Sequence, residues 1–280
     1  MVDTSLNSLY RLLGCCWYSW QGPWWVGRRG EPRADPAGAE EQLMEATQVP
    51  GVLCREIMPD SCTGADSSRA NLEQPVRYEP LGEEHGDEVM QLLLHSFFRE
   101  EPLGIAAGVR TPEDVHHWLP AFVRPIARAG LSSVAVEAES GRVVGVALCH
   151  LVEGHSHDSP LMAALQPQRD TKAMAVAQFL ADLHIGLDED AGSLSLLVLN
   201  VERHFSGRGI AAELVRTTEE RARQRGLKAV TADTTGEFSK KTFERLGFRV
   251  LRELRYEDYS GCTLRPGPVH TTARVMLKNL

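Results

Sequence analysis

From residue 76 to the end of the chain, short apolar runs alternate with segments whose apolar residues recur every three or four positions. The first pattern predicts β-strands and the second predicts amphipathic helices. Strands are predicted at 76–80, 132–138, 142–152, 194–201, 227–233, 248–254 and 269–277. Helices are predicted at 83–98, 111–126, 170–185, 210–225 and 234–246. Since strands and helices interleave without an internal repeat, we expect an α/β fold with a mixed sheet.

Local signals place several of these boundaries. In the helix 83–98, Val89, Leu92, Leu93 and Ser96 share one face. Pro102 ends that helix, because the residue before a proline is pushed out of the helical region. The remaining boundary signals are Thr111-Pro112 and Asp170-Thr171 as helix starts, and Glu139-Ser140-Gly141 as a hairpin turn.

A strand, a glycine turn and a helix follow one another between residues 194 and 226. Gly207 and Gly209 permit a tight turn and leave the backbone amides uncovered, and the helical pattern begins at Ile210. Free amides and the positive end of the helix dipole then converge on one point, which favours a phosphate or pyrophosphate. Arg208 is a further candidate contact. A Gly-x-Gly turn by itself is a weak signal.

This turn strongly resembles the GNAT superfamily of N-acetyltransferases. The match rests on Ser206-Gly207-Arg208-Gly209-Ile210-Ala211 and on the Leu246-Gly247-Phe248 ending. The resemblance implies the GNAT fold, a central mixed twisted sheet flanked by helices, and binding of acetyl-CoA with no metal. The implied cofactor-binding residues are Leu199, Asn200, Val201, Ser206, Gly207, Arg208, Gly209, Ile210, Ala211 and Ser239.

Two positions depart from the superfamily pattern. Ser206 stands where Arg or Gln is usual, which removes a side chain but keeps the backbone amides. Phe243 stands where many members carry a tyrosine that protonates the leaving thiolate. The chain therefore lacks that general acid.

Within the superfamily, the sequence most resembles the insect-type arylalkylamine N-acetyltransferases, which lack the same tyrosine. The segments that carry this resemblance are 96–103 with its Glu-Pro-Leu ending, 235–239 with hydroxyl residues four apart, and 255–259 with Tyr-x-x-Tyr. The resemblance covers residues 76–280. It implies that Glu101 is the catalytic base and that Thr235 and Ser239 are catalytic or contact the substrate.

Acetyl transfer to an amine has its own chemical requirements. An alkylamine has a pKa of about 10.4, so it arrives protonated and needs a base. Glu101, pinned by Pro102 beside Phe97 and Phe98, is the candidate. As in the family, backbone amides near Asn200 and Val201 are candidates to stabilise the thioester oxygen. Ser239, Thr235 or solvent would protonate the thiolate, and transfer would be direct.

Each of these residues also has a purely structural interpretation. Glu101 can be a solvated loop carboxylate, Thr235 a helix cap, and Ser239 a donor to a backbone carbonyl. Trp118 and Phe122 can line an aromatic amine pocket or only pack, and packing is the interpretation we adopt. Cys149 is expected to be a buried small residue. His155-Ser156-His157-Asp158 resembles a set of metal ligands but is expected to be a solvated loop.

Composition narrows the class of partner. The 280 residues are 42% hydrophobic and carry a formal net charge of -8, which argues against nucleic acid and suits a cationic substrate. The six cysteines have no metal-like spacing and favour a reducing compartment, so we expect a cytoplasmic protein. We also expect a monomer.

Residues 1–75 differ from the rest of the chain. Trp17, Trp20, Trp24 and Trp25 cluster in the segment 17–25, and 28–71 is rich in Pro, Gly, Ala, Asp and Glu without periodicity. We expect an N-terminal extension that is disordered, followed by the acetyltransferase domain at 76–280. Asp3 and Arg11 argue against a signal peptide. Contact of residues 10–25 with a membrane surface stays an alternative, but no stretch is long enough to span a bilayer.

The sequence therefore predicts an acyltransferase that moves an acetyl group from acetyl-CoA to the primary amine of dopamine, serotonin, tyramine, octopamine or a similar small arylalkylamine. Acetylation of polyamines or another amine remains an alternative, because only the acceptor pocket separates these substrates. An inactive module that binds CoA is the alternative from a different class.

Overall fold

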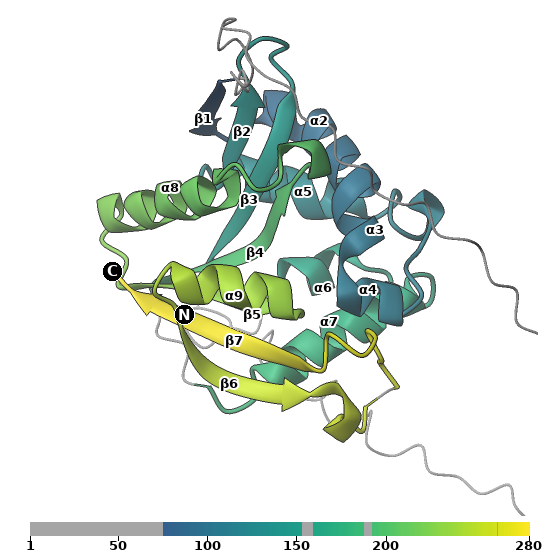
Figure 1. Ribbon diagram of the computed structural model, residues 1–280. Helices are drawn as coiled ribbons and strands as arrows, with labels where there is room; N and C mark the ends of the chain where they lie inside the picture. The colour runs from purple at the N-terminus through teal and green to yellow at the C-terminus, as the bar shows by residue number, and fades with distance from the viewer. Residues whose placement is uncertain (1–74, 153–158, 188–191, 262) are drawn as a thin grey trace, which may run out of the picture. The chain divides into compact units, whose positions relative to one another are not determined.

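Seven strands of the described part of the chain form one mixed sheet in the order β1-β2-β3-β4-β5-β7-β6 (Figure 1). The computed structural model describes residues 75–152, 159–187, 192–261 and 263–280. The strands are β1 Val76–Pro80, β2 Ser133–Glu137, β3 Val143–Val152, β4 Ser193–Val201, β5 Ala229–Thr234, β6 Arg249–Arg255 and β7 Thr272–Asn279. Every predicted strand is present, with boundaries shifted by a few residues.

The helices lie between these strands. They are α2 Gly86–Leu92, α3 Phe98–Glu100, α4 Pro102–Ala106, α5 Leu119–Arg128, α6 Pro160–Ala164, α7 Thr171–Leu183, α8 Ile210–Gln224 and α9 Glu237–Arg245. Single turns of 3-10 helix are η1 Glu83–His85, η3 Pro112–Asp114, η4 Arg203–Phe205 and η5 Tyr256–Asp258. The sequence analysis did not predict α4 or α6, which are five residues each and too short for a periodic signal.

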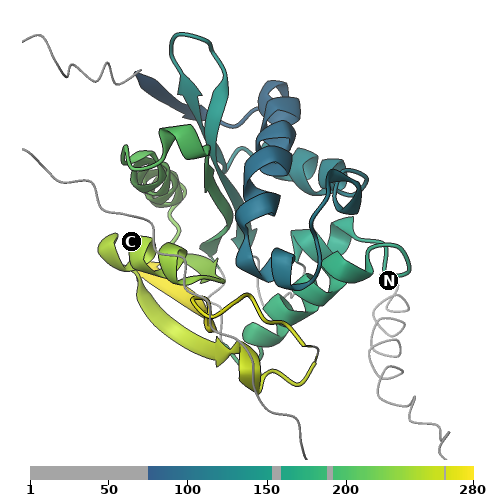
Figure 2. The same ribbon diagram turned by 45° about the vertical axis from the view of Figure 1, so that its right-hand side comes forward.

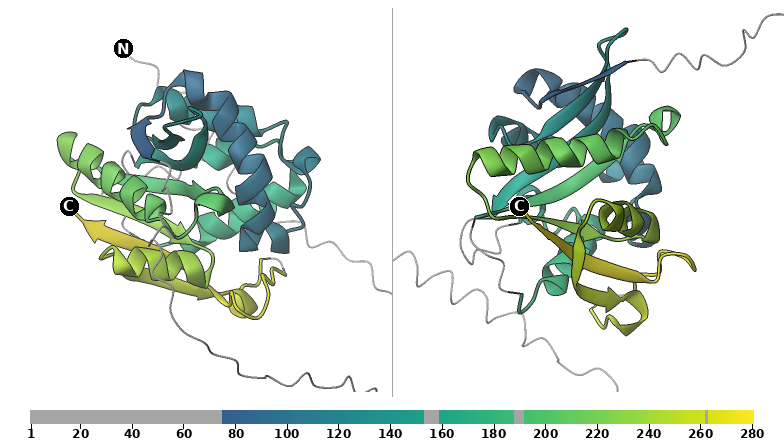
Figure 3. Two further views of the ribbon diagram at one scale, coloured as in Figure 1. Left: turned by 45° about the horizontal axis from the view of Figure 1, so that its top comes forward. Right: turned by 60° about the vertical axis from the view of Figure 1, so that its left-hand side comes forward.

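Helices cover both faces of the sheet. Figures 1 and 3 show α8 and α9 on one face, and α2, α5 and α7 on the other. Alternation along β2 explains this arrangement, because Val134 packs into the core beneath α2 and α5 while Ala135 packs into the core beneath α8. A third cluster joins α4 and α7 to β7 through residues such as Leu103, Phe179 and Val275.

The strands β4 and β5 separate partway along their length. All neighbouring strands pair antiparallel except these two, which run parallel and pair from Ser193–Ala229 to Leu196–Ala232. Beyond that point β4 continues to Val201 and β5 to Thr234 without pairing to each other. The register of β3 on β4 also shifts after Leu148, which leaves Leu197 as an extra residue in β4. The edges of the two strands thus open a gap within the sheet.

The predicted helix 83–98 is present but irregular. Residues Leu93–Phe97 form a π-helical turn, η2, between α2 and α3. The predicted inner face is confirmed, because Val89, Leu92, Leu93 and Ser96 are all buried. A π-turn inserts one residue into the helical repeat and rotates the residues that follow it. Phe97 is the last residue of this turn, and Phe98 and Glu101 follow it in the chain.

Two predicted helix starts are confirmed in position, since Thr111 and Asp170 are the N-caps of η3 and α7, but both differ in detail. The expected helix 111–126 is interrupted, since η3 ends at Asp114 and α5 begins only at Leu119. Pro120 has no N–H to continue the helix, and it lies in the first turn of α5, where that donor is not needed. At the start of α7, Asp170 makes no side-chain cap; its carboxylate instead contacts His117 and the backbone N–H of Gln166.

Candidate active site

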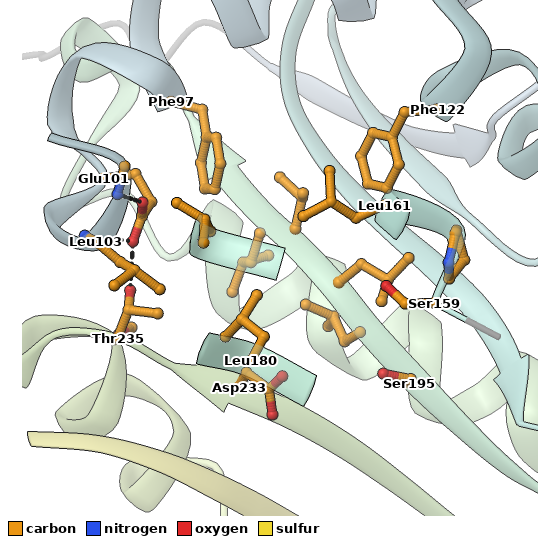
Figure 4. A pocket seen from close by; sticks show the side chains of 18 of the residues that line it. Phe97, Glu101, Leu103, Phe122, Ser159, Leu161, Leu180, Ser195, Asp233 and Thr235 are labelled. Atoms are coloured by element: carbon orange, nitrogen blue, oxygen red, sulfur yellow. Dashed lines mark hydrogen bonds between the residues drawn. The ribbon is translucent and has the colours of Figure 1, made fainter. Parts of the chain in front are cut away.

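A cavity of about 460 Å³ lies where the sheet opens, between the ends of β4 and β5 and the helices α3, α4, α7 and α9 (Figure 4). Its walls are mostly apolar. The aromatic part includes Phe97, Phe98, Trp118, Phe122, Phe238 and Phe243. Polar side chains that reach the cavity include Glu101, His150, Ser159, His184, Ser195, Asp233, Thr235 and Ser239. Segments more than 130 residues apart therefore contribute to one site.

Glu101 is fixed at one end of the cavity by three donors. It is the N-cap of α4, and its Oε1 accepts from the backbone N of Leu103 at 2.9 Å while its Oε2 accepts from Gly104. Thr235 Oγ1 donates to the same Oε1 at 2.6 Å. Figure 4 shows this chain of contacts, with Glu101 facing Thr235 across the cavity wall. The sequence analysis did not predict a contact between Glu101 and Thr235.

Burial raises the pKa of the Glu101 carboxyl above its ordinary value. The hydrogen bonds from Thr235, Gly104 and Leu103 and the charge of His270 act in the opposite direction but do not cancel the effect of burial. A carboxylate with a raised pKa is a stronger base. Glu101 is thus better matched to proton transfer near neutral pH than an exposed glutamate.

A layer behind Thr235 holds this end of the cavity in place. Tyr256 donates from its hydroxyl to the backbone O of Thr235 at 2.7 Å and stacks on Phe179 of α7. Burial, followed by the charge of Glu101, raises the pKa of Tyr256 far above its ordinary value, so this phenol stays protonated. The Tyr-x-x-Tyr segment of the sequence therefore has a structural role here, since Tyr259 also packs on Phe179.

Three segments meet at Gly236, the N-cap of α9. A Cβ atom at Gly236 would lie 2.8 Å from Nδ1 of His270 and 3.2 Å from Cγ of Pro102. His270 Nδ1 also accepts from the backbone N of Glu237 at 3.2 Å. Figures 1 and 2 show the loop before β7 coming up beside α4 and the start of α9. The sequence analysis missed Gly236 and His270 because no local pattern connects them to Glu101.

The aromatic wall is a single packed array. Phe98 lies between Phe97 and Trp118, with ring centroids 5.2 and 5.7 Å apart, and Trp118 contacts Phe122 at 6.2 Å. All are edge-to-face contacts, which stabilise the array and fix its surface. Trp118 and Phe122 are buried and also line the cavity, so they pack and face the site at the same time.

The glycine turn leads into α8 as the sequence predicted. Gly207 and Gly209 both have φ of 79°, a left-handed conformation that favours glycine, and a Cβ atom at either would meet nothing within 4 Å. The first helical hydrogen bond runs from Glu213 N to Gly209 O, so the amides of the first turn precede it. The turn is therefore an open backbone surface with the geometry of an anion site. The Arg208 guanidinium lies over Phe205, 4.7 Å from the ring centroid, and donates to His204 O.

The open edge of β4 presents part of its backbone to the cavity. Glu202 N donates to Val144 O on β3, and alternate residues of a strand point their amides to opposite sides. The amide of Asn200 therefore points to β3, whereas those of Leu199 and Val201 point toward the gap. On the side of the gap, β4 therefore exposes the backbone N–H groups of Leu199 and Val201, whereas that of Asn200 faces β3. The Asn200 side chain instead accepts from Ser96 Oγ at 3.2 Å.

The first two turns of α9 bring Ser239 and Phe243 to the cavity. Ser239 Oγ donates to Gly236 O at 2.9 Å. Phe243 is buried and packs against Phe248, with 4.9 Å between the ring centroids. The position that carries an acid in many superfamily members is here an apolar contact. Ser206 and Ile210 flank the glycine turn, and Ala211 of α8 lines the cavity.

Within the described residues, no group of three or more His, Cys, Asp or Glu side chains is placed to hold a metal ion. The sequence His155-Ser156-His157-Asp158 lies outside the described residues, as does the extension 1–74. Across the described part of the chain, no helix is both long enough and apolar enough to cross a membrane. Cys149 is buried, as predicted.

Several solved structures share this architecture. Arylalkylamine N-acetyltransferase 2 from Aedes aegypti is 25% identical, with a TM-score of 0.63 over 73% of this chain and 98% of that chain. The mosquito protein named arylalkylamine N-acetyltransferase like 5b is 21% identical, with a TM-score of 0.63 over 74% of this chain and 100% of that chain. The Drosophila melanogaster polyamine N-acetyltransferase, which forms N-acetylagmatine, is 23% identical, with a TM-score of 0.63 over 74% and 100%.

The family model gives the same result from sequence. The model of the acetyltransferase (GNAT) family matches residues 78–248, more than half of the chain. This range contains the strand, glycine turn and helix together with Glu101, Thr235 and Ser239. Family model, sheet topology and structural neighbours agree that the chain belongs to the acetyltransferase (GNAT) family.

Proposed function

We propose that this acetyltransferase transfers the acetyl group of acetyl-CoA to the primary amine of a small arylalkylamine, of the type of dopamine, serotonin, tyramine or octopamine. The observation that carries the proposal is the position of Glu101. It is a carboxylate held by Thr235 and two backbone amides in the cavity that the aromatic wall and the open edge of β4 also line. The arylalkylamine N-acetyltransferase from Aedes aegypti supports the acceptor class as the 25% identical neighbour.

The chain fits acetyl-CoA, which supplies the acetyl group as a thioester. The amides at Gly207, Arg208, Gly209 and Ile210 would bind its pyrophosphate, because the turn is open and leads into the positive end of α8. The edge of β4 offers the amides of Leu199 and Val201 to groups in the gap. One of these amides would stabilise the thioester oxygen as negative charge develops on it.

Glu101 would remove the proton from the bound ammonium, directly or through one water. Its raised pKa suits the task, and Thr235 holds its Oε1 in position. The free amine then attacks the thioester carbon directly, without an acyl-enzyme. Ser239 lies one turn before Phe243 on α9 and lines the cavity. On turning away from Gly236 O, its hydroxyl would donate to the leaving thiolate.

The aromatic wall favours an acceptor with an aromatic ring. Phe97, Trp118 and Phe122 offer ring edges and faces to the cavity, and burying an aromatic ring against them removes a large apolar area from water. An aliphatic amine would leave part of this surface unfilled. The geometry therefore supports an arylalkylamine over a polyamine as acceptor.

A radiolabelled acetyl-transfer assay with a panel of amines tests the proposal. We expect tyramine, dopamine and serotonin to accept the label with higher kcat/KM than spermidine, putrescine or agmatine. A preference for the aliphatic amines would contradict the acceptor class and leave the acetyltransferase assignment intact. Absence of transfer to every amine, with acetyl-CoA still bound in calorimetry, would support the inactive CoA-binding module instead.

A further inference from the structure

The acceptor cavity contains a second carboxylate besides Glu101. Asp233 lies on β5, two residues before Thr235, and its side chain lines the same cavity with 28% exposure. Thr235 directly follows the last residue of β5. In extended backbone, Cα atoms two residues apart are about 7 Å apart, at ~3.3 Å per residue. Figure 4 shows Asp233 and Thr235 along one wall, with Glu101 beyond Thr235. The two carboxylates thus line one cavity at separate points.

His184 holds the Asp233 carboxylate in place. His184 follows α7, and its Nε2 lies 2.8 and 2.9 Å from the two carboxylate oxygens. An ionised carboxylate only accepts hydrogen bonds, so Nε2 carries the proton in this contact. A carboxylate has about four acceptor positions, and one shared donor leaves others for a ligand. The pair is therefore an oriented acceptor at the cavity wall.

The side of the cavity opposite Asp233 is apolar. Leu161 of α6 and Phe122 of α5 line it, and Figure 4 shows them across the cavity from Asp233 and Ser195. Burying a carboxylate against such a surface costs free energy unless its acceptors are used. A ligand that presents an apolar ring to the helices and a hydrogen-bond donor to the sheet would satisfy both sides.

We propose that Asp233, positioned by His184, is a specificity subsite that accepts a hydrogen bond from a ring hydroxyl of the amine acceptor. The inference rests on the proposed function and adds the chemical group that the cavity recognises. The amine lies at Glu101, the ring packs against the aromatic and leucine side chains, and the hydroxyl reaches Asp233. The hydroxyl is separated from the amine by the ring and a two-carbon arm, and the two carboxylates are likewise separated along the wall.

The experiment compares kcat/KM for tyramine and for phenethylamine, which differ only in the ring hydroxyl. We expect the wild-type full-length chain to prefer tyramine, and Asp233→Leu to reduce the tyramine-to-phenethylamine ratio by roughly 10- to 100-fold, the range for a hydrogen bond to a charged group. Because both amines are measured on one preparation, a partly unfolded variant leaves the ratio unaffected. His184→Gln should lower the ratio less, mainly through the KM for tyramine.

Asp87→Asn is the matched control, because it removes one negative charge from an exposed side chain outside the cavity. It should keep the wild-type ratio. A tyramine-to-phenethylamine ratio near one in the wild type would overturn the subsite. So would an unchanged ratio in both Asp233→Leu and His184→Gln. Either result leaves the proposed acetylation of arylalkylamines intact. A preference for putrescine that Asp233→Leu abolishes would show that the pair binds a second ammonium. Transfer to neither arylalkylamine would refute the proposed function itself.

Discussion

Replacement of Glu101 by glutamine separates its role as a base from its role as a helix cap. The carboxylate accepts from Leu103 N and Thr235 Oγ1 on one oxygen and from Gly104 N on the other. Glutamine has the same size but offers one oxygen and one NH₂ group. If the amide oxygen still accepts the hydrogen bonds from Leu103 N and Thr235 Oγ1, the NH₂ group faces the N–H of Gly104. Two donors then point at each other.

The magnitudes of the two effects differ enough to be distinguished. Leaving the Gly104 N–H unsatisfied costs about 1–3 kcal/mol of stability, partly offset because no buried charge remains. For a domain of this size that corresponds to a decrease in Tm of at most roughly 10 °C. Loss of a general base reduces turnover by ~10²- to 10⁴-fold, or about 2.7–5.4 kcal/mol in the activation free energy. The variant should therefore be folded, bind acetyl-CoA and turn over slowly.

The pH profile provides the decisive measurement. In the wild type, kcat should fall as the pH drops through the pKa of Glu101, which burial places above its ordinary value. In Glu101→Gln this acidic limb should be absent, and kcat/KM should rise with pH up to the pKa of the amine, about 10.4, as free amine becomes available. The assay is steady-state acetyl transfer to tyramine between pH 5 and 10. The concentration of the variant is raised so that a rate reduced by ~10²-fold still gives a linear time course.

Glu100→Gln is the matched control, since Glu100 is the adjacent carboxylate, is exposed and does not line the cavity. Glu100→Gln should keep the wild-type turnover and the acidic limb of the pH profile. A folded Glu101→Gln enzyme with near-normal turnover at neutral pH would refute the assignment, and Asp233 or a water would then have to take the proton. Equal loss of rate in both variants would point to long-range charge effects instead of a base.

Three further predictions concern the rest of the chain. Gly209→Glu should abolish binding of acetyl-CoA in calorimetry by placing a carboxylate in the anion site, whereas Gly209→Asn, which tolerates the left-handed backbone, should retain most of it. Thr235→Val removes a hydrogen bond that lowers the pKa of Glu101, so the acidic limb of kcat should move to higher pH, and Thr235→Ser should restore it. A chain beginning at Asn71 should remain folded by circular dichroism and acetylate soluble amines; insolubility or inactivity would show that the preceding residues belong to the core.

The sequence by itself determined the strands, the longer helices and the glycine turn. Short apolar runs predicted all seven strands, because such a run is a local property of the sequence. Gly207 and Gly209 were identified from spacing, and the structure gives both a positive φ. The identification of Glu101 came through family resemblance, since an isolated Glu-Pro dipeptide has no local signature of catalysis.

Irregular helix geometry lay beyond the sequence pattern. The π-turn 93–97 keeps the same buried face as a regular helix over Val89 to Ser96, so periodicity does not reveal it. The break before Leu119 depends on a proline that fits equally well inside a helix start or after a helix end. These details matter because they set the direction of Phe97, Phe98 and Glu101.

Only the tertiary structure decided which side chains meet in the site. Thr235 contacts Glu101 across 134 positions of sequence, and His184 contacts Asp233 across 49. Such pairs depend on how α4 and α7 pack against the opened edge of the sheet, and packing is set by the sum of many apolar contacts instead of by any local motif. The separation of β4 from β5, which creates the cavity itself, is likewise a property of strand pairing that neither strand encodes alone.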